Sequence, residues 1–229
     1  MGLAVSINGF WMHCVSNTAS ELVGEHRPDW PRTITVALTG ASGAHYGLRL
    51  IECLIRSGIR VYLLISQAAQ VVVKMETGLE LPARANEAES FLSERFQAVP
   101  GQLRVFGRQE WTAPVASGSH PAEAMVVCPC TTGTLGRLAA GLSSCLIERA
   151  ADVSLKERRP LILVVRETPF STIHLENMLR LAQAGAIIMP ANPGFYNNPS
   201  RIEDIVDFMV ARVLDHLGVS HHLVKRWGD

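Results

Sequence analysis

The chain has 229 residues, of which 48% are hydrophobic, and its 21 basic and 21 acidic side chains give a formal net charge of zero. A chain of this length and composition can bury one full hydrophobic core, so a single domain is the simplest organisation. The balanced charge argues against nucleic acid or an anionic membrane surface as a partner, because neither would meet an opposite charge. A small molecule is the expected ligand.

Five cysteines are spread through the chain, with no repeated Cys-x-x-Cys pair and no histidine pattern of a zinc site beside them. The odd count favours a reducing compartment over the oxidising setting of disulfide-rich secreted proteins. No apolar run approaches the ~20 residues of a membrane-spanning helix, and no basic region followed by a hydrophobic stretch opens the sequence. We therefore expect a cytoplasmic protein that uses no metal.

Residues 1–31 do not follow the pattern of the rest of the chain. They are irregular, rich in Ser, Asn and His, and they close on Arg-Pro-Asp-Trp-Pro. Two alternatives stay open for this extension: it is disordered, or Phe10, Trp11 and Trp30 pack on a neighbouring subunit. Residues 32–229 are expected to form a single α/β domain.

Strands and helices alternate through that domain. Apolar runs bounded by turn signals predict buried strands, and amphipathic segments predict helices between them. The expected strands are residues 33–38, 60–65, 124–128, 161–165 and 186–189, and the expected helices include residues 44–57, 66–77, 87–96 and 146–158. This alternation is typical of the α/β class with a parallel sheet.

The first strand leads into a glycine turn at Gly40 and Gly43, and a helix start follows directly. Glycine lets the backbone bend sharply and approach a ligand, while a helix start directs free N–H groups and the positive end of its dipole at an anion. Ser42 adds a hydroxyl group at the tip of the turn. The turn predicts a phosphate site, and packing alone is the alternative explanation.

The spacing of this turn argues against NAD. The glycines follow Gly-x-x-Gly-x-x-x-Gly, whereas the dinucleotide fingerprint is Gly-x-Gly-x-x-Gly. Ser66 and Gln67 also stand at the end of the second strand, where an acidic residue would hold the ribose of NAD. A nucleotide or a flavin is therefore favoured.

A second polar turn follows the strand at residues 124–128. Thr131, Thr132, Gly133 and Thr134 offer hydroxyl and backbone N–H groups to an anion or to the edge of a flavin ring. An ordinary threonine cap of the next helix is the alternative. Two such turns at strand ends favour the ligand explanation.

One charged pair stands where ligands bind in parallel sheets. Arg166 and Glu167 follow the strand at residues 161–165, and the carboxyl ends of strands form the usual ligand crevice. Other charged residues have a simpler explanation. Glu76 is expected to be a surface carboxylate, and Arg149 and Lys156 fit a solvated helix face.

The remaining candidates lie on loops and helix ends. A long loop around Trp111 and Ser117 is of the kind that covers sites in α/β folds. His174, near a helix start, is expected to cap or to pack. A proline-rich loop presents Tyr196, and Arg212 on the apolar face of the last helix needs either to snorkel or to meet an anionic partner.

Taken together, five motifs resemble the flavin prenyltransferases of the UbiX type, within the homo-oligomeric flavoproteins of flavodoxin-like fold. They are Leu-Thr-Gly-Ala-Ser-Gly-Ala, Cys-Pro-Cys-Thr-Thr-Gly-Thr-Leu, Leu-Ile-Glu-Arg-Ala-Ala-Asp-Val-Ser-Leu-Lys-Glu-Arg-Arg-Pro-Leu, Arg-Glu-Thr-Pro-Phe-Ser-Thr-Ile-His-Leu-Glu-Asn-Met and Pro-Gly-Phe-Tyr. The resemblance covers residues 33–228, and Thr131 stands where serine is frequent in the family. It implies a three-layer, doubly wound, mostly parallel Rossmann-like sheet.

The resemblance also implies roles for individual residues. FMN would be bound by Gly40, Ala41, Ser42, Ser66, Thr131, Thr132, Gly133, Thr134 and Arg149. Dimethylallyl monophosphate would be held by Ser117, Lys156, Arg166, Tyr196 and Arg212, with Trp111 and Trp227 near the prenyl chain. Glu167 would be the main acid or base, supported by Ser42 and Glu76.

The implied reaction joins the dimethylallyl group to N5 and C6 of reduced FMN. Lys156, Arg166 and Arg212 would neutralise the leaving phosphate without a metal, and aromatic faces would stabilise an allylic cation. The resemblance implies delivery of prenylated FMN to a UbiD-type decarboxylase, with ubiquinone biosynthesis as the destination. It also implies a homo-oligomer, a dodecamer in this family.

Two alternatives remain open at this level. One is an FMN-dependent cysteine decarboxylase on the same fold, although its Pro-Ala-Ser-Ala-Asn-Thr stretch is not found in the sequence. The other is a flavin carrier without chemistry, for which the cluster of Lys156, Arg166, Glu167, Tyr196 and Arg212 would be unnecessary.

Overall fold

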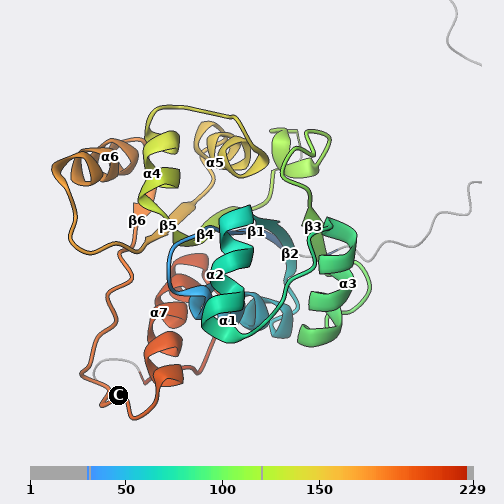
Figure 1. The fold of residues 1–229 in the computed structure, drawn as a ribbon, viewed down its shortest axis with the longest axis vertical. Helices are drawn as coiled ribbons and strands as arrows, with labels where there is room; N and C mark the ends of the chain where they lie inside the picture. Colours follow the sequence, from blue (N-terminus) through green and yellow to red (C-terminus); the bar gives the residue numbers. More distant parts are fainter. Residues whose placement is uncertain (1–29, 31, 120, 226–229) are drawn as a thin grey trace, which may run out of the picture.

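The computed structural model describes residue 30, residues 32–119 and residues 121–225 of the chain. In this part, six strands form one parallel sheet in the order β3-β2-β1-β4-β5-β6 (Figure 1). The strands are β1 (Thr33–Leu38), β2 (Arg60–Ile65), β3 (Leu103–Phe106), β4 (Ala124–Cys130), β5 (Leu161–Val165) and β6 (Ile187–Ile188). The predicted α/β class with a parallel sheet is confirmed.

Helices cover both faces of the sheet, which gives three layers (Figure 1). They are α1 (Ala44–Arg56), α2 (Gln67–Thr77), α3 (Ala85–Phe96), η1 (Pro114–Ala116), α4 (Thr132–Ala139), α5 (Leu146–Lys156), α6 (Thr172–Gln183) and α7 (Ile202–Leu217). One core cluster joins α1, α2, α3 and α7 to the sheet, and the other joins α4, α5 and α6. Alternation along β1 explains the division, because Ile34 and Val36 belong to the first cluster and Ala37 to the second.

The strand order reverses direction between β1 and β4. The chain moves from β1 to β2 and β3 on one side, and from β4 to β5 and β6 on the other. Such a reversal opens a crevice at the carboxyl ends of the two central strands, where ligands bind in doubly wound sheets. The pairing of Leu38 with Ile65, and of Cys130 with Val165, brings the following residues to this one edge.

Local capping signals explain where three of the helices begin. The side chains of Ser66 and Thr131 accept hydrogen bonds from the backbone three residues on, at 3.1 and 3.0 Å, and so begin α2 and α4. His174 accepts from the N–H of Ser171 at 3.2 Å in a capping box, so its predicted capping role is confirmed. The sixth strand, β3, carries no long apolar run, and the sequence pattern did not identify it.

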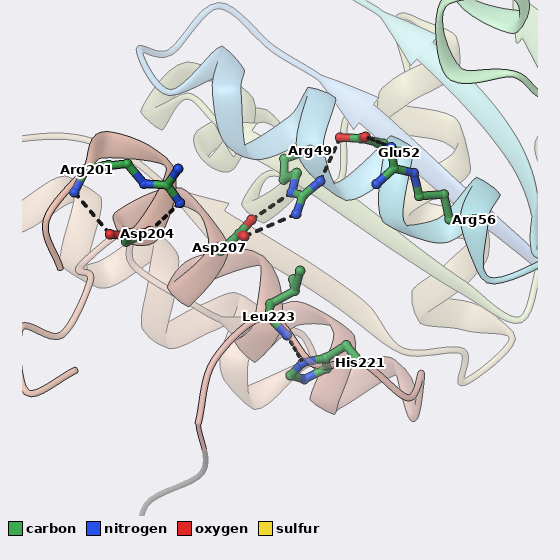
Figure 2. A network of polar contacts seen from close by, with 8 residues as sticks. All are labelled: Arg49, Glu52, Arg56, Arg201, Asp204, Asp207, His221 and Leu223. Atoms are coloured by element: carbon green, nitrogen blue, oxygen red, sulfur yellow. Dashed lines mark hydrogen bonds and ion pairs between the residues drawn. The ribbon is translucent and has the colours of Figure 1, made fainter. Parts of the chain in front are cut away.

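Polar contacts join α1 to α7 on one face of the sheet (Figure 2). Arg49 donates from Nε to Asp207 Oδ1 at 2.7 Å and from Nη2 to Oδ2 at 3.1 Å. The hydrogen bond to Asp207 raises the pKa of Arg49, so the pair stays ionised. Arg32, just before β1, donates to the carbonyl of Leu217 at 2.7 Å, which places the end of α7 at the edge where the strands begin.

Among the described residues, no helix combines the length and the apolar character needed to span a membrane. Four cysteines, Cys53, Cys128, Cys130 and Cys145, are free thiols and all are buried.

Candidate functional site

The two polar turns are joined directly by hydrogen bonds. Thr39, at the end of β1, donates from its hydroxyl group to the carbonyl of Pro129 at 2.7 Å. The same hydroxyl accepts from the N–H of Thr131 at 2.9 Å. The glycine turn (residues 40–43) and the second polar turn (residues 131–134, the threonine turn) therefore lie side by side at the carboxyl edge of the sheet, as their positions at strand ends predict.

The start of α1 is already occupied by a carboxylate of the protein. The N–H of Gly43 donates to Glu76 at 3.0 Å, and the N–H of Ala44 donates to it at 2.8 Å. Two of the N–H groups that this helix start was expected to offer a phosphate are therefore taken by Glu76 in this structure. Gly43 has φ 108°, a left-handed conformation for which glycine is needed. Gly40 is required by packing, since a Cβ there would lie 2.4 Å from Cβ of Ala68.

Glu76 is an ionised group of the site rather than the surface carboxylate expected from sequence. Its side chain is 22% exposed. Burial raises the pKa of this carboxyl, but hydrogen bonds from the Ser42 hydroxyl and from the N–H groups of Ala44 and Gly43 outweigh it and hold the pKa below its ordinary value. Ser42 and Glu76, predicted to act together, are thus in contact.

Tyr46 is a site residue that the sequence analysis missed. Its ring packs on the glycine turn, because a Cβ on Gly43 would lie 2.8 Å from Tyr46 Cδ2. Burial raises the pKa of this phenol, and the charge of Arg166 acts in the opposite direction. Tyr46 therefore contacts Gly43, as Glu76 also does. Its spacing of three residues from Gly43, one helical turn, is the signal that could have identified it.

The threonine turn contacts the predicted acid or base. Thr132 Oγ1 donates to Glu167 Oε2 at 3.4 Å, and the N–H of Thr168 donates to Glu167 Oε1 at 3.0 Å. The N–H of Arg166 donates to the carbonyl of Cys130 at 3.2 Å, which fixes the end of β5 beside the end of β4. The charged pair thus borders the threonine turn, as predicted for residues at neighbouring strand ends.

A pocket of about 270 Å³ opens between these turns. It is lined by Thr39, Gly40, Ser66, Gln67, Ala68, Arg108, Thr131, Thr134, Arg137, Cys145, Ile147 and Glu148. Four of them, Gly40, Ser66, Thr131 and Thr134, are predicted FMN residues. The starts of α2, α4 and α5 meet here, and the first N–H groups of a helix have no acceptor within it. These donors, together with two arginines, fit the phosphate end of FMN.

A second group of predicted residues gathers around the loop at 116–119. Arg149 donates from Nε to the carbonyl of Ala116 at 3.0 Å and from Nη1 to Asp152 at 2.8 Å. Lys156 pairs with Glu157 and lies beside the loop, because a Cβ on Gly118 would be 2.9 Å from Lys156 Nζ. Ser117 is in the same loop.

Lys156 is separated from the pocket by the length of α5. The first turn of α5 lines the pocket at the carboxyl edge of the sheet, and Lys156 is its last residue. A helix of 11 residues spans ~16 Å, at 1.5 Å per residue. Lys156 therefore lies toward the opposite edge of the sheet in its own chain.

Arg212 lies toward that opposite edge as well, but on the other face. It stands five residues before the end of α7, pairs with Asp215 at 2.8 Å and has a side chain that is 51% exposed. The expectation of an arginine on the apolar face is thus wrong, whereas an anionic partner is found. Tyr196 packs edge-to-face on Phe208 with ring centroids 5.6 Å apart.

Of the two predicted tryptophans, Trp111 is 47% exposed and Trp227 lies outside the described residues. One chain thus brings together the glycine turn, Ser42, Ser66, Glu76, the threonine turn, Arg166 and Glu167. It does not bring Lys156 or Arg212 to them.

Comparison with known proteins gives matches along most of the chain. A family model described as Flavoprotein matches residues 23–214. The flavin prenyltransferase UbiX of Pseudomonas aeruginosa is 57% identical over 199 residues, which cover 87% of this chain and 95% of the relative.

Two solved structures are similar in fold and sequence. A crystal structure of AnUbiX (PadA1) in complex with FMN and dimethylallyl pyrophosphate superposes with a TM-score of 0.77 at 39% identity, covering 86% of this chain and 98% of that chain. A dodecameric FMN-dependent UbiX-like decarboxylase from Escherichia coli O157:H7 superposes with a TM-score of 0.75 at 38% identity, covering 86% of this chain and 100% of that chain.

Proposed function

The chain belongs to the flavin prenyltransferase UbiX family and makes prenylated FMN, and we propose that its prenyl donor is dimethylallyl monophosphate and its acceptor reduced FMN. The observation that best supports this proposal is the meeting of two polar strand-end turns with an ionised carboxylate and an Arg-Glu pair at one edge of the sheet. The relative with FMN and dimethylallyl pyrophosphate bound supports a flavin acceptor and a dimethylallyl donor that carries phosphate.

The phosphate end of FMN is proposed to bind in the 270 Å³ pocket. Ser66 and Thr131 cap the helices that open there, and the N–H groups beyond these caps are directed to the phosphate oxygens. The glycine turn contributes Gly40 to the pocket wall, and Ala41, the next residue of the turn, is proposed to contact FMN beside it. The role of Ser42 is different, because its hydroxyl contacts Glu76.

Reduced FMN supplies a nucleophilic ring, and protons must move as the new bonds form. Glu167 is proposed to hold and release that proton, since it borders the threonine turn and lies beside Arg166. Ser42 and Glu76 are proposed to act as a second proton path. Glu76 is ionised, so it can accept a proton through the Ser42 hydroxyl.

The cations for the leaving phosphate are proposed to come from more than one subunit. Arg166 stands at the carboxyl edge, whereas Lys156 and Arg212 lie toward the other edge, on opposite faces of the sheet. The pocket of one chain is also slightly smaller than the ~300–1,000 Å³ usual for ligand sites. We therefore propose that neighbouring copies supply Lys156 and Arg212, in a dodecamer like that of the Escherichia coli relative.

The same assembly would complete the remaining parts of the donor site. Ser117 lies in the same loop as Gly118, beside Lys156, and would accompany it, whereas Arg149, which donates to Ala116 of that loop, is proposed to bind FMN. Tyr196, Trp111 and Trp227 are proposed to face the prenyl chain, where their rings would stabilise positive charge.

Further proposals concern the setting of the protein. Residues 32–229 are proposed to form the single flavin-binding domain, with residues 1–31 as an extension. The buried free thiols fit a reducing cytoplasm. The prenylated FMN is proposed to serve a UbiD-type decarboxylase, and ubiquinone biosynthesis is the proposed pathway.

The reaction is tested by anaerobic incubation of the protein with reduced FMN and dimethylallyl monophosphate. We expect a flavin whose mass has increased by one prenyl unit, in the absence of added metal. Retention of FMN without any new flavin would favour a carrier. Release of carbon dioxide from a cysteine-terminated peptide, with no prenylated flavin, would favour the cysteine decarboxylase alternative.

A further inference from the structure

An arginine and a buried glutamate form a pair in the lining of the 270 Å³ pocket. Arg137 on α4 donates from Nε to Oε1 of Glu148, in the first turn of α5, at 2.6 Å. Both residues line the pocket. Neither belongs to the set that the family resemblance assigned to FMN.

Glu148 is held in one orientation. Its side chain is 3% exposed, and its second oxygen, Oε2, accepts from the N–H of Ser144 at 2.7 Å and from the hydroxyl of Ser144 at 2.6 Å. Burial raises the pKa of Glu148, but the hydrogen bonds from Ser144 and Arg137 outweigh it and hold the pKa below its ordinary value. The carboxylate is therefore ionised, and it acts as a fixed anchor for Arg137.

The anchored guanidinium reaches back over the start of α4. A Cβ on Gly133 would lie 3.7 Å from Arg137 Nη1 and 4.0 Å from Thr131 Oγ1. Glu148 accepts only from Nε, so the N–H groups of Nη1 and Nη2 remain available as hydrogen-bond donors. No described residue pairs with them. The Arg137 side chain is 48% exposed, and the residue lines the pocket.

We propose that Arg137 binds the phosphate of FMN through Nη1 and Nη2, and that Glu148 positions it for this contact. The inference rests on the proposed placement of the FMN phosphate in this pocket. Arg137 would act beside the N–H groups of the threonine turn, and a planar guanidinium suits the oxygens of a phosphate. Glu148 balances the charge of Arg137 when no phosphate is present.

A phosphate contact has a measurable signature, because riboflavin is FMN without the phosphate. The titration follows quenching of flavin fluorescence with oxidised FMN and, separately, with riboflavin as probes. In Arg137→Met we expect FMN affinity to fall about 10-fold to 100-fold, the effect of losing a charge-assisted hydrogen bond, while riboflavin affinity stays within about 3-fold. Arg137→Lys keeps the positive charge but loses the planar guanidinium group. Its FMN affinity should lie between that of the unmodified protein and that of Arg137→Met.

Arg56→Met is the matched control. Arg56 is also an arginine paired with a glutamate, Glu52, at 2.7 Å, but it lies at the far end of α1 and does not line the 270 Å³ pocket (Figure 2). We expect both affinities to match those of the unmodified protein. Equal losses of FMN and riboflavin affinity in Arg137→Met, or no loss of either, would overturn the phosphate contact.

The positioning role of Glu148 is tested by a double-mutant cycle. If Glu148 orients Arg137, the Arg137→Met change should cost less than about 3-fold in FMN affinity once Glu148→Gln is present. An undiminished cost in that background would overturn the positioning role. An unmodified protein that binds no FMN would refute the proposed function itself, whereas normal prenylation with no effect of Arg137→Met refutes this inference alone.

Discussion

Two regions of the molecule carry the predicted site residues, and they differ in how far one chain completes them. At the carboxyl edge of the sheet, Thr39 joins the two polar turns, and Glu167 contacts Thr132. At the ends of α5 and α7, Lys156 and Arg212 pair instead with acidic neighbours in their own chain. In the first region, called the finished region below, one chain brings the predicted residues into contact with one another. In the second region, Lys156 and Arg212 are cations that do not meet the other predicted residues within one chain.

The difference follows from the topology of the fold. Residues just after parallel strands arrive at one edge whatever their distance in sequence, so the chain gathers them by itself. Residues late in the crossover helices are carried back toward the other edge, ~16 Å away in the case of α5. If Lys156 and Arg212 neutralise the leaving phosphate, as proposed, they can do so only at the site of a neighbouring copy.

The largest expected effect is in the finished region. Glu167→Gln keeps the shape of the side chain and a hydrogen bond to Thr132, but it cannot exchange a proton. We expect prenylated flavin to form about 100-fold to 10,000-fold more slowly, with FMN affinity unchanged within about 3-fold. Rapid quenching followed by mass spectrometry of the flavin measures the rate. A normal rate would leave Glu167 as a scaffold for the threonine turn.

A second prediction tests whether the two regions meet between subunits. Lys156→Met should slow prenylation by about 100-fold or more, because a desolvated phosphate loses a neutralising charge. Hybrid oligomers are then made by co-expressing Lys156→Met with Glu167→Gln under two purification tags. Each variant alone supplies no intact site.

If Lys156 serves a site whose Glu167 belongs to another copy, about a quarter of the sites in an equal hybrid will have both natural residues. The hybrid should therefore recover about a quarter of the unmodified rate. A hybrid no faster than its parents would show that both residues act within one chain. The second region would then need no neighbouring copy.

Sequence patterns predicted most strands of the sheet, because a buried strand can be recognised from a few consecutive residues. Apolar runs such as residues 161–165 and glycine or threonine turns after them identify strands and their ends with no knowledge of the tertiary fold. β3 was missed because it is an edge strand of only four residues, Leu103–Phe106. The arginine inside it interrupts the apolar run by which the other strands were recognised.

The candidate site was predicted less completely, because its key contacts span long distances in sequence. Glu76 lies 33 residues from Gly43, yet it occupies the N–H groups that the glycine turn was expected to offer a phosphate. Likewise, the apolar stripe of α7 did not show that Arg212 points to Asp215. Family resemblance implied roles for these residues, whereas the structure showed which contacts they make within one chain.

The smallest expected effect concerns the stability that Glu76 gives to the finished region. Glu76→Ala leaves two N–H groups at the start of α1 without their carboxylate, so the free energy of unfolding at pH 7 should fall by about 1–2 kcal/mol. Glu94→Ala, which removes an exposed carboxylate of α3, is the control and should have no measurable effect. Chemical denaturation of both variants measures the difference.

The pH dependence of this effect has a definite sign. The pKa of Glu76 is lower in the folded protein than its ordinary value of 4.5, so the folded state prefers the ionised form. Its stabilising contribution is therefore complete above pH ~4.5 and is lost as the pH falls through the lowered pKa. The gap in unfolding free energy between the unmodified protein and Glu76→Ala should accordingly narrow between pH 7 and pH 3. A gap that widens on acidification would mean that Glu76 is protonated in the folded state, and Ser42 would then face a neutral acid that cannot accept its proton.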